Sequence, residues 1–172
     1  MNTNQIQEIE NEKINPIVDL IKSSNFLEAE KKLMQLLEKK PNSIICLNFM
    51  ALCLVNQKKN EEAISILKKI IEIKPNFSEA YNNLGTLYKQ MGSLDTSINY
   101  FRKAIKFNSG FTQAYSNLAG LLYLKGKSNY EEAILNCEKA IKNSPNYYPA
   151  YNTMGLIYKG LNKFEKSISN LK

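Results

Sequence analysis

The sequence has no histidine, no tryptophan and only three cysteines among its 172 residues. Without histidine, imidazole metal ligands and histidine general bases are excluded. Cys46 and Cys53 lie seven positions apart on one predicted helix, which is about 10 Å along the axis and beyond the reach of a disulfide. So few cysteines predict a reducing compartment rather than a disulfide framework. We interpret Cys137 as a small buried hydrophobic residue.

Long apolar runs are absent as well. None approaches the roughly 18 residues of a membrane span. The polar, acidic N-terminus lacks the basic and apolar regions of a signal peptide. These absences predict a cytoplasmic protein without a membrane anchor, in which residues 1–9 form a tail or a polar cap.

Catalytic and cofactor-binding motifs are missing too. The chain has no glycine-rich phosphate loop after a predicted strand and no recognisable nucleophile–base pair. The acidic pairs Glu61-Glu62 and Glu131-Glu132 fall in the first turn of predicted helices, where carboxylates stabilise the positive end of the helix dipole. We therefore expect no catalytic residue, no metal site and no cofactor, and we predict that this chain is not an enzyme.

The formal net charge of +7 comes from lysines scattered along the chain rather than from one cluster. No arginine cluster, aromatic-rich sheet or nucleic-acid recognition motif accompanies them. Basic charge alone supplies only non-specific attraction to phosphates. We do not expect nucleic acid to be a partner.

What the sequence does contain is a repeat of about 34 residues. Pro41 and Pro75 are 34 positions apart, and the same step leads to Ser109. Pro145 follows after 36 positions, and the two extra residues are a predicted loop insertion at Ser128-Asn129. The same two intervals separate three tyrosines, Tyr81, Tyr115 and Tyr151. A fixed period near 34 with two predicted helices per unit is typical of a helical solenoid.

Residues 75–111 show the repeating unit most clearly. Apolar residues recur at helical spacing in two runs, and Gly92 between the runs ends the first predicted helix. Gly85 in the first run and Ser97 in the second are small where the two apolar stripes meet, which predicts a close antiparallel helix pair. The stripes consist of Ala80, Leu84, Leu87, Tyr88 and Met91, and of Leu94, Ile98, Phe101, Ala104 and Ile105.

This unit resembles the tetratricopeptide repeat (TPR), whose pattern is aromatic, Leu-Gly, Tyr, Gly, Ala, aromatic, Ala and Pro. The matching residues are Tyr81, Leu84, Gly85, Tyr88, Gly92, Ser97, Phe101 and Ala104. The resemblance implies an all-α fold, a right-handed α-solenoid of antiparallel helix pairs that forms a TPR superhelix. It divides residues 10–172 into a single solenoid of repeats at 10–43 (degenerate), 44–77, 78–111, 112–147 and 148–172 (truncated).

In the resembled family, the first helix of each repeat lines a groove that binds partner proteins, and two known binding modes can be compared. The carboxylate clamp of chaperone-docking TPR proteins is absent, because its lysine and asparagine positions hold Asn82 and Thr86 here. The asparagine ladder of O-GlcNAc transferase arrays is matched only in part, at two of four positions. Asn83 and Asn117 match it, whereas Phe49 and Thr153 do not. An asparagine-rich composition that fills these positions by chance is the alternative. The predicted partner-binding residues are Asn48, Asn82, Asn83, Thr86, Lys89, Gln90, Gln113, Ser116, Asn117, Tyr123, Asn152 and Thr153.

Two functions follow from this resemblance. The first is an adaptor or scaffold that binds an extended peptide or a helix of an unidentified protein partner in the groove. The second is the N-terminal substrate-recruiting arm of a larger transferase, either an O-GlcNAc-type glycosyltransferase or a sulfotransferase, whose catalytic domain lies outside this chain.

The two ends of the array raise further expectations. The chain stops within the second helix of the fifth repeat, which leaves three expectations open. The array could belong to a longer one, could precede an effector domain, or could self-associate through an incompletely covered apolar end. Near the other end, Ile45, Phe49 and Leu52 form either a hydrophobic binding spot or a surface beneath the N-terminal segment. The residues expected to be partly exposed at the C-terminal end are Met154, Ile157, Tyr158, Phe164, Ile168 and Leu171.

Overall fold

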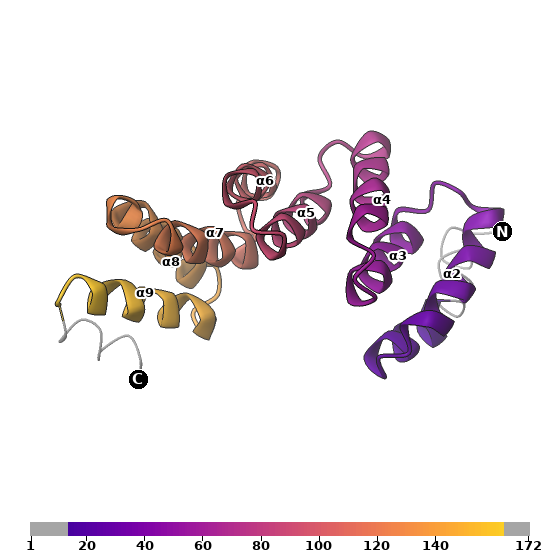
Figure 1. Ribbon diagram of the computed structural model, residues 1–172, viewed down its shortest axis with the longest axis horizontal. Helices are drawn as coiled ribbons and strands as arrows, with labels where there is room; N and C mark the ends of the chain where they lie inside the picture. The colour runs from indigo at the N-terminus through magenta and orange to yellow at the C-terminus, as the bar shows by residue number, and fades with distance from the viewer. Residues whose placement is uncertain (1–13, 164–172) are drawn as a thin grey trace. The chain divides into compact units, whose positions relative to one another are not determined.

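The computed structural model describes residues 14–163, and every regular element within that range is a helix (Figure 1). Residues 14–22 are helical. The helices that follow are α2 (Phe26–Lys39), α3 (Ile44–Asn56), α4 (Asn60–Ile73), α5 (Ser78–Gln90), α6 (Leu94–Phe107), α7 (Thr112–Leu124), α8 (Tyr130–Asn143) and α9 (Tyr148–Gly160), with the short 3-10 helix η1 (Lys127–Asn129) before α8. The predicted all-α array of sequential helix pairs is confirmed.

The chain forms two compact units, Met1–Pro75 and Asn76–Lys172. In unit 1, α2 packs against α3 and α3 against α4. In unit 2, α5 pairs with α6 and α7 pairs with α8, while α7 also contacts both α5 and α9. Within unit 2, a short turn reverses the chain after each helix, so α5, α7 and α9 run in the same sense.

The turn inside each helix pair holds one residue in the left-handed region. Gly92 has φ +76°, and its N–H donates to the Lys89 carbonyl at 3.0 Å while the Ser93 N–H donates to the Tyr88 carbonyl at 2.9 Å. These two bonds form a Schellman motif, so the predicted end of the helix at Gly92 is confirmed. Left-handed residues at the equivalent turns are Ser24, Lys58, Gly126 and Asn162.

The predicted insertion at Ser128-Asn129 coincides with η1, which follows Gly126 directly. A single 3-10 turn accommodates the two extra residues on the outside of the α7–α8 pair, because such short turns serve as connectors between helices. The period therefore lengthens here without loss of the helix pair.

The close approach predicted at Gly85 is confirmed. A Cβ atom built on Gly85 would lie 2.7 Å from Phe101 Cε1, and Phe101 is fully buried. The Ser97 hydroxyl donates a buried hydrogen bond of 2.5 Å to the Gly85 carbonyl. The absence of a side chain at Gly85 thus allows both the ring and the hydroxyl of α6 to reach the backbone of α5.

Two expectations for apolar residues are wrong. Met91 was placed on the buried stripe, but α5 ends at Gln90 and Met91 lies in the turn, 46% exposed. Met154 and Ile157 are predicted to be partly exposed, but both are buried because their side of α9 packs into clusters with Tyr115 and Leu118 of the preceding helix pair. Tyr158 is half-buried, as expected. The remaining residues named at that end, Phe164, Ile168 and Leu171, lie outside the described residues.

Candidate functional site

Helices α5, α7 and α9 contact each other in the order α5, α7, α9 within unit 2. Each buries one side in the core and leaves outside it positions that recur every three or four residues, which is one stripe of a helix. We call the surface formed by these stripes the α5–α7–α9 face. Its residues are Glu79, Asn83, Thr86, Lys89, Gln90, Gln113, Asn117, Gly120, Tyr123, Leu124, Asn152, Thr153, Leu156 and Lys159, all exposed or half-buried.

Two of the predicted partner-binding residues lie inside the protein instead. Asn82 is 3% exposed and Ser116 is 6% exposed. The Asn82 side-chain carbonyl accepts a hydrogen bond of 3.3 Å from the Asn117 amide. Asn82 therefore connects consecutive repeats and positions Asn117, and we no longer expect either buried residue to touch a partner directly. The pair is 35 positions apart, one more than the repeat, so a search for strict 34-residue spacing does not find it.

The hydrogen bond that Asn117 donates to Asn82 uses only part of the Asn117 side-chain amide. Asn117 is half-buried and its side-chain oxygen has no hydrogen-bond partner among residues 14–163. An asparagine amide carries both donors and an acceptor, so it can bond to a peptide group. The neighbouring Asn83 is also half-buried and takes part in an interaction of its own.

The two threonine hydroxyls of this face donate hydrogen bonds to backbone carbonyls of their own helices. Thr86 Oγ1 donates to the Asn82 backbone carbonyl at 3.1 Å, and Thr153 Oγ1 donates to the Pro149 carbonyl at 3.0 Å. Bonding back to residue i−4 is common for threonine in helices. These hydroxyls retain only acceptor capacity for a partner.

Aromatic stacking holds Tyr123 in place. Its ring stacks on Tyr130 of α8, with ring centroids 5.5 Å apart and an interplanar angle of 23°. Such stacking fixes the ring orientation. Tyr123 therefore offers a preorganised edge to the α5–α7–α9 face.

Charge is sparse and one-sided on this face. Lys89 lies in the last turn of α5 and Lys159 in the last turn of α9, and α7 has no charged residue between Thr112 and Leu124. Glu79 lies at the opposite end of α5, where its carboxylate accepts a hydrogen bond of 3.0 Å from Ser78. Because the three helices run in the same sense, the two lysines lie along one edge of the face. Gln90, Gln113 and Asn152 add exposed, uncharged polar groups.

Unit 1 presents a more apolar surface. On α3, Ile45 is 54% exposed and Leu52 is 41% exposed. Phe49, which lies between them in the sequence, is half-buried. Asn48, the predicted partner-binding residue of this helix, is half-buried and already takes part in an interaction.

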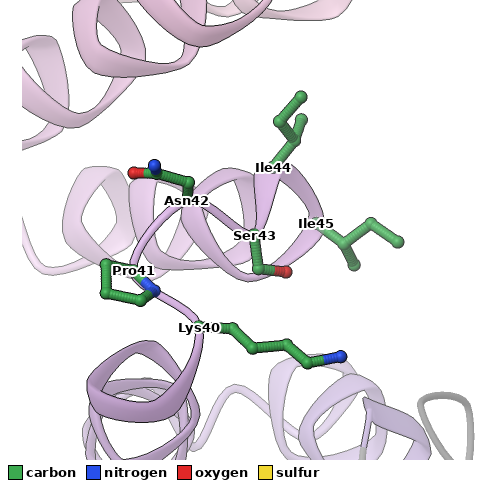
Figure 2. Close-up of a pocket in the computed structure, with 6 residues that line it drawn as sticks. All are labelled: Lys40, Pro41, Asn42, Ser43, Ile44 and Ile45. Atoms are coloured by element: carbon green, nitrogen blue, oxygen red, sulfur yellow. The ribbon is translucent and has the colours of Figure 1, made fainter.

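A shallow depression near this surface is lined by Lys40, Pro41, Asn42, Ser43, Ile44 and Ile45. Figure 2 shows that these side chains point away from one another rather than toward a common centre. All six belong to the α2–α3 connection and the start of α3. A small-molecule site places a few polar groups so that they converge in an apolar pocket, and this depression does not.

Nucleophilic and metal-binding groups do not gather in the described part of the chain. No group of three or more His, Cys, Asp or Glu residues there could hold a metal ion. Burial, with a smaller contribution from Glu30, raises the pKa of Cys53 to about 11. Burial, with a smaller contribution from Glu138, raises the pKa of Cys137 to about 12. Both thiols stay protonated near neutral pH and are therefore poor nucleophiles. Among the described helices, none combines the length and apolar character needed to cross a membrane.

Comparison with known proteins places these features in a family. Residues 11–123 match the model of the N-terminal TPR repeats region of Psidin, and residues 112–147 and 148–172 match the tetratricopeptide repeat. The comparison with curated protein sequences gives no match.

Solved structures with the same fold are similar over most of the chain. A MamA crystal structure has a TM-score of 0.75 and 23% identity, and the likeness covers 89% of this chain and 88% of that one. PilF of Pseudomonas aeruginosa has a TM-score of 0.85 and 14% identity, with 95% and 74% covered. YrrB, described as a TPR protein with an unusual peptide-binding site, has a TM-score of 0.67 and 17% identity, with 98% and 89% covered.

The expected link to O-GlcNAc transferases finds no support in these relatives, whose low identities show the fold alone. The family models, in contrast, cover the chain from residue 11 to its end. The chain therefore belongs to the tetratricopeptide repeat proteins, whose repeats generally mediate protein–protein interactions.

Proposed function

We propose that the α5–α7–α9 face binds an extended segment of a partner protein, with Asn83 and Asn117 bonding to its backbone. The observation that carries this proposal is the hydrogen bond from Asn117 to the buried Asn82 amide. It holds the Asn117 side chain in one orientation before any partner arrives, which lowers the conformational entropy lost on binding.

The composition of the face supports an extended peptide rather than a small ligand. Its amides, hydroxyls and single glycine are spread over three helices instead of converging on one cavity. Backbone recognition by asparagine amides does not demand particular side chains on the partner. The peptide-binding description of YrrB concerns that protein, and it favours the same use of the fold here.

The test is peptide binding by the Asn83→Ala/Asn117→Ala double variant. We expect its affinity for a pooled library of short fluorescent peptides to fall by roughly tenfold, since two hydrogen bonds to backbone groups are lost. Asn99→Ala is the matched control, because Asn99 is an exposed asparagine of α6 outside this face. Far-UV circular dichroism and thermal melting establish that the variants remain folded. Unchanged affinity in a folded double variant would refute the assignment of the face.

The N-terminal arm of a larger transferase is the second function that the sequence allows. Its chemistry would lie outside this chain, and the relatives named above do not favour it. The adaptor is therefore the function we propose, and the arm stays a prediction.

A further inference from the structure

We propose that the α5–α7–α9 face selects acidic segments anchored by one large apolar side chain, an inference that rests on the function proposed above. The apolar side chain lies over Gly120 in the middle of the face. Acidic neighbours in the same segment meet Lys89 and Lys159 along its edge.

Gly120 has no structural requirement for glycine. It lies inside α7, where glycine is less stable than alanine, and its backbone is not among those with positive φ. A Cβ built on Gly120 would meet no heavy atom within 4 Å, whereas one on Gly85 would strike Phe101 and one on Gly160 would lie 3.1 Å from the Tyr130 hydroxyl. The missing side chain at Gly120 thus serves no packing contact and leaves an open position in the centre of the face.

Two exposed leucines occupy related positions, one on the same helix and one on the neighbouring helix α9. Leu124 follows Gly120 by one turn on α7 and is 60% exposed. Leu156 on α9 has the same position in its repeat as Gly120 and is 49% exposed. Both are large apolar side chains on a face that is otherwise polar. An apolar side chain of a partner would remove this surface from water, which is favourable in proportion to the area buried.

The charges determine which apolar segments fit. Lys89 and Lys159 are exposed, and neither forms an ion pair with any residue that the structure describes. No carboxylate lies on α7 or α9, and Glu79 stands at the other end of α5. Asp95, at the start of α6, is already paired with Lys125 just after α7. The net charge of +7 also attracts acidic partners at a distance. Acidic residues beside the apolar anchor complement this edge, and basic residues are repelled by it.

The experiment measures binding of the full chain to three fluorescent pools of random peptides by anisotropy. Two adjacent central positions are fixed as Leu-Glu, Leu-Lys or Ser-Glu. We expect the Leu-Glu pool to bind roughly tenfold more tightly than either of the others. Gly120→Leu fills the open position and should abolish the advantage of leucine over serine, without lowering the melting temperature. Lys89→Glu with Lys159→Glu should make Leu-Lys the preferred pool.

Lys106→Glu with Lys142→Glu is the matched control for charge. Both lysines are exposed and lie in the last turns of α6 and α8, so the net charge and the helix-dipole effects change equally while the face stays intact. This control should retain the preference for Leu-Glu.

The possible outcomes distinguish the preference for acidic, apolar segments from peptide binding as such. Equal binding of all three pools overturns the acidic and apolar preference but leaves backbone recognition standing. Reversal of the preference in the Lys106 and Lys142 control also overturns it, because overall charge would then explain the selection. A folded chain that binds no pool contradicts the peptide-binding function itself.

Discussion

Replacing Gly85 by alanine places a methyl group against a ring that has little room to move. The new Cβ would lie 2.7 Å from Phe101 Cε1 and 2.8 Å from Cδ1. Phe101 is fully buried and shares its core cluster with Ile98 and Leu118. The Ser97 hydroxyl bonds to the Gly85 carbonyl, so separating the two helices would also stretch that bond. Core packing at native density transmits such a clash instead of absorbing it.

The expected magnitude follows from two opposing effects. Overpacking a filled core costs about 1–3 kcal/mol, whereas exchanging glycine for alanine inside a helix gains about 1 kcal/mol. Gly85→Ala should therefore destabilise the protein by about 1 kcal/mol. Gly120→Ala makes the same chemical change where the methyl group meets no atom within 4 Å, so it should stabilise the protein by about 1 kcal/mol. The difference between the two variants isolates the clash with Phe101.

The assay is urea unfolding followed by far-UV circular dichroism, with both variants compared with the unaltered chain. Gly85→Ala should lower the midpoint and Gly120→Ala should raise it. In a Phe101→Leu background, Gly85→Ala should lose its cost, because the ring atoms it strikes are gone, and the two substitutions should be coupled. If Gly85→Ala raised the midpoint as much as Gly120→Ala in the unaltered background, the close approach of α5 and α6 at Gly85 would be refuted.

Three other predictions concern the turn, pH and the thiols. Lys58 has φ +62°, so Lys58→Gly should stabilise the protein by about 1 kcal/mol in urea unfolding; no change would contradict left-handed strain at this turn. Burial alone would raise the pKa of Glu30, but the hydrogen bonds from Gln57 and Lys59 hold it below its usual value. The stability that Glu30 contributes is therefore present above its unfolded pKa and lost as the pH falls through the lower folded pKa. Glu30→Gln should therefore reduce the loss of unfolding free energy on acidification. An unchanged dependence of the unfolding free energy on pH would contradict this. Cys137, with a pKa near 12, should react with a thiol reagent only on unfolding, and fast reaction of the native chain would disprove its burial.

Local features of the array were predictable because they depend on neighbours in sequence. The helix end at Gly92 follows from the need for a left-handed residue after the last turn, and the insertion at Ser128-Asn129 follows from the interrupted period. The burial of Cys137 follows from its place on an apolar stripe. Met91 was misjudged because helical periodicity was extended one residue past the end of α5.

The sequence by itself determined the repeat, the helix pairs and the need for a small residue at Gly85, since these depend on spacing along one chain. Only the tertiary structure decided which polar residues of the first helices face outward. Asn82 and Asn117 are both asparagines on the first helix of a repeat, yet Asn82 is buried and holds the half-exposed Asn117 in place. Gly120 lies one repeat position after the place of Gly85, and only the structure shows that it is open whereas Gly85 is covered by Phe101. Burial depends on which neighbouring helix packs over a position, and that is a property of how the repeats pack in three dimensions rather than of the repeat pattern.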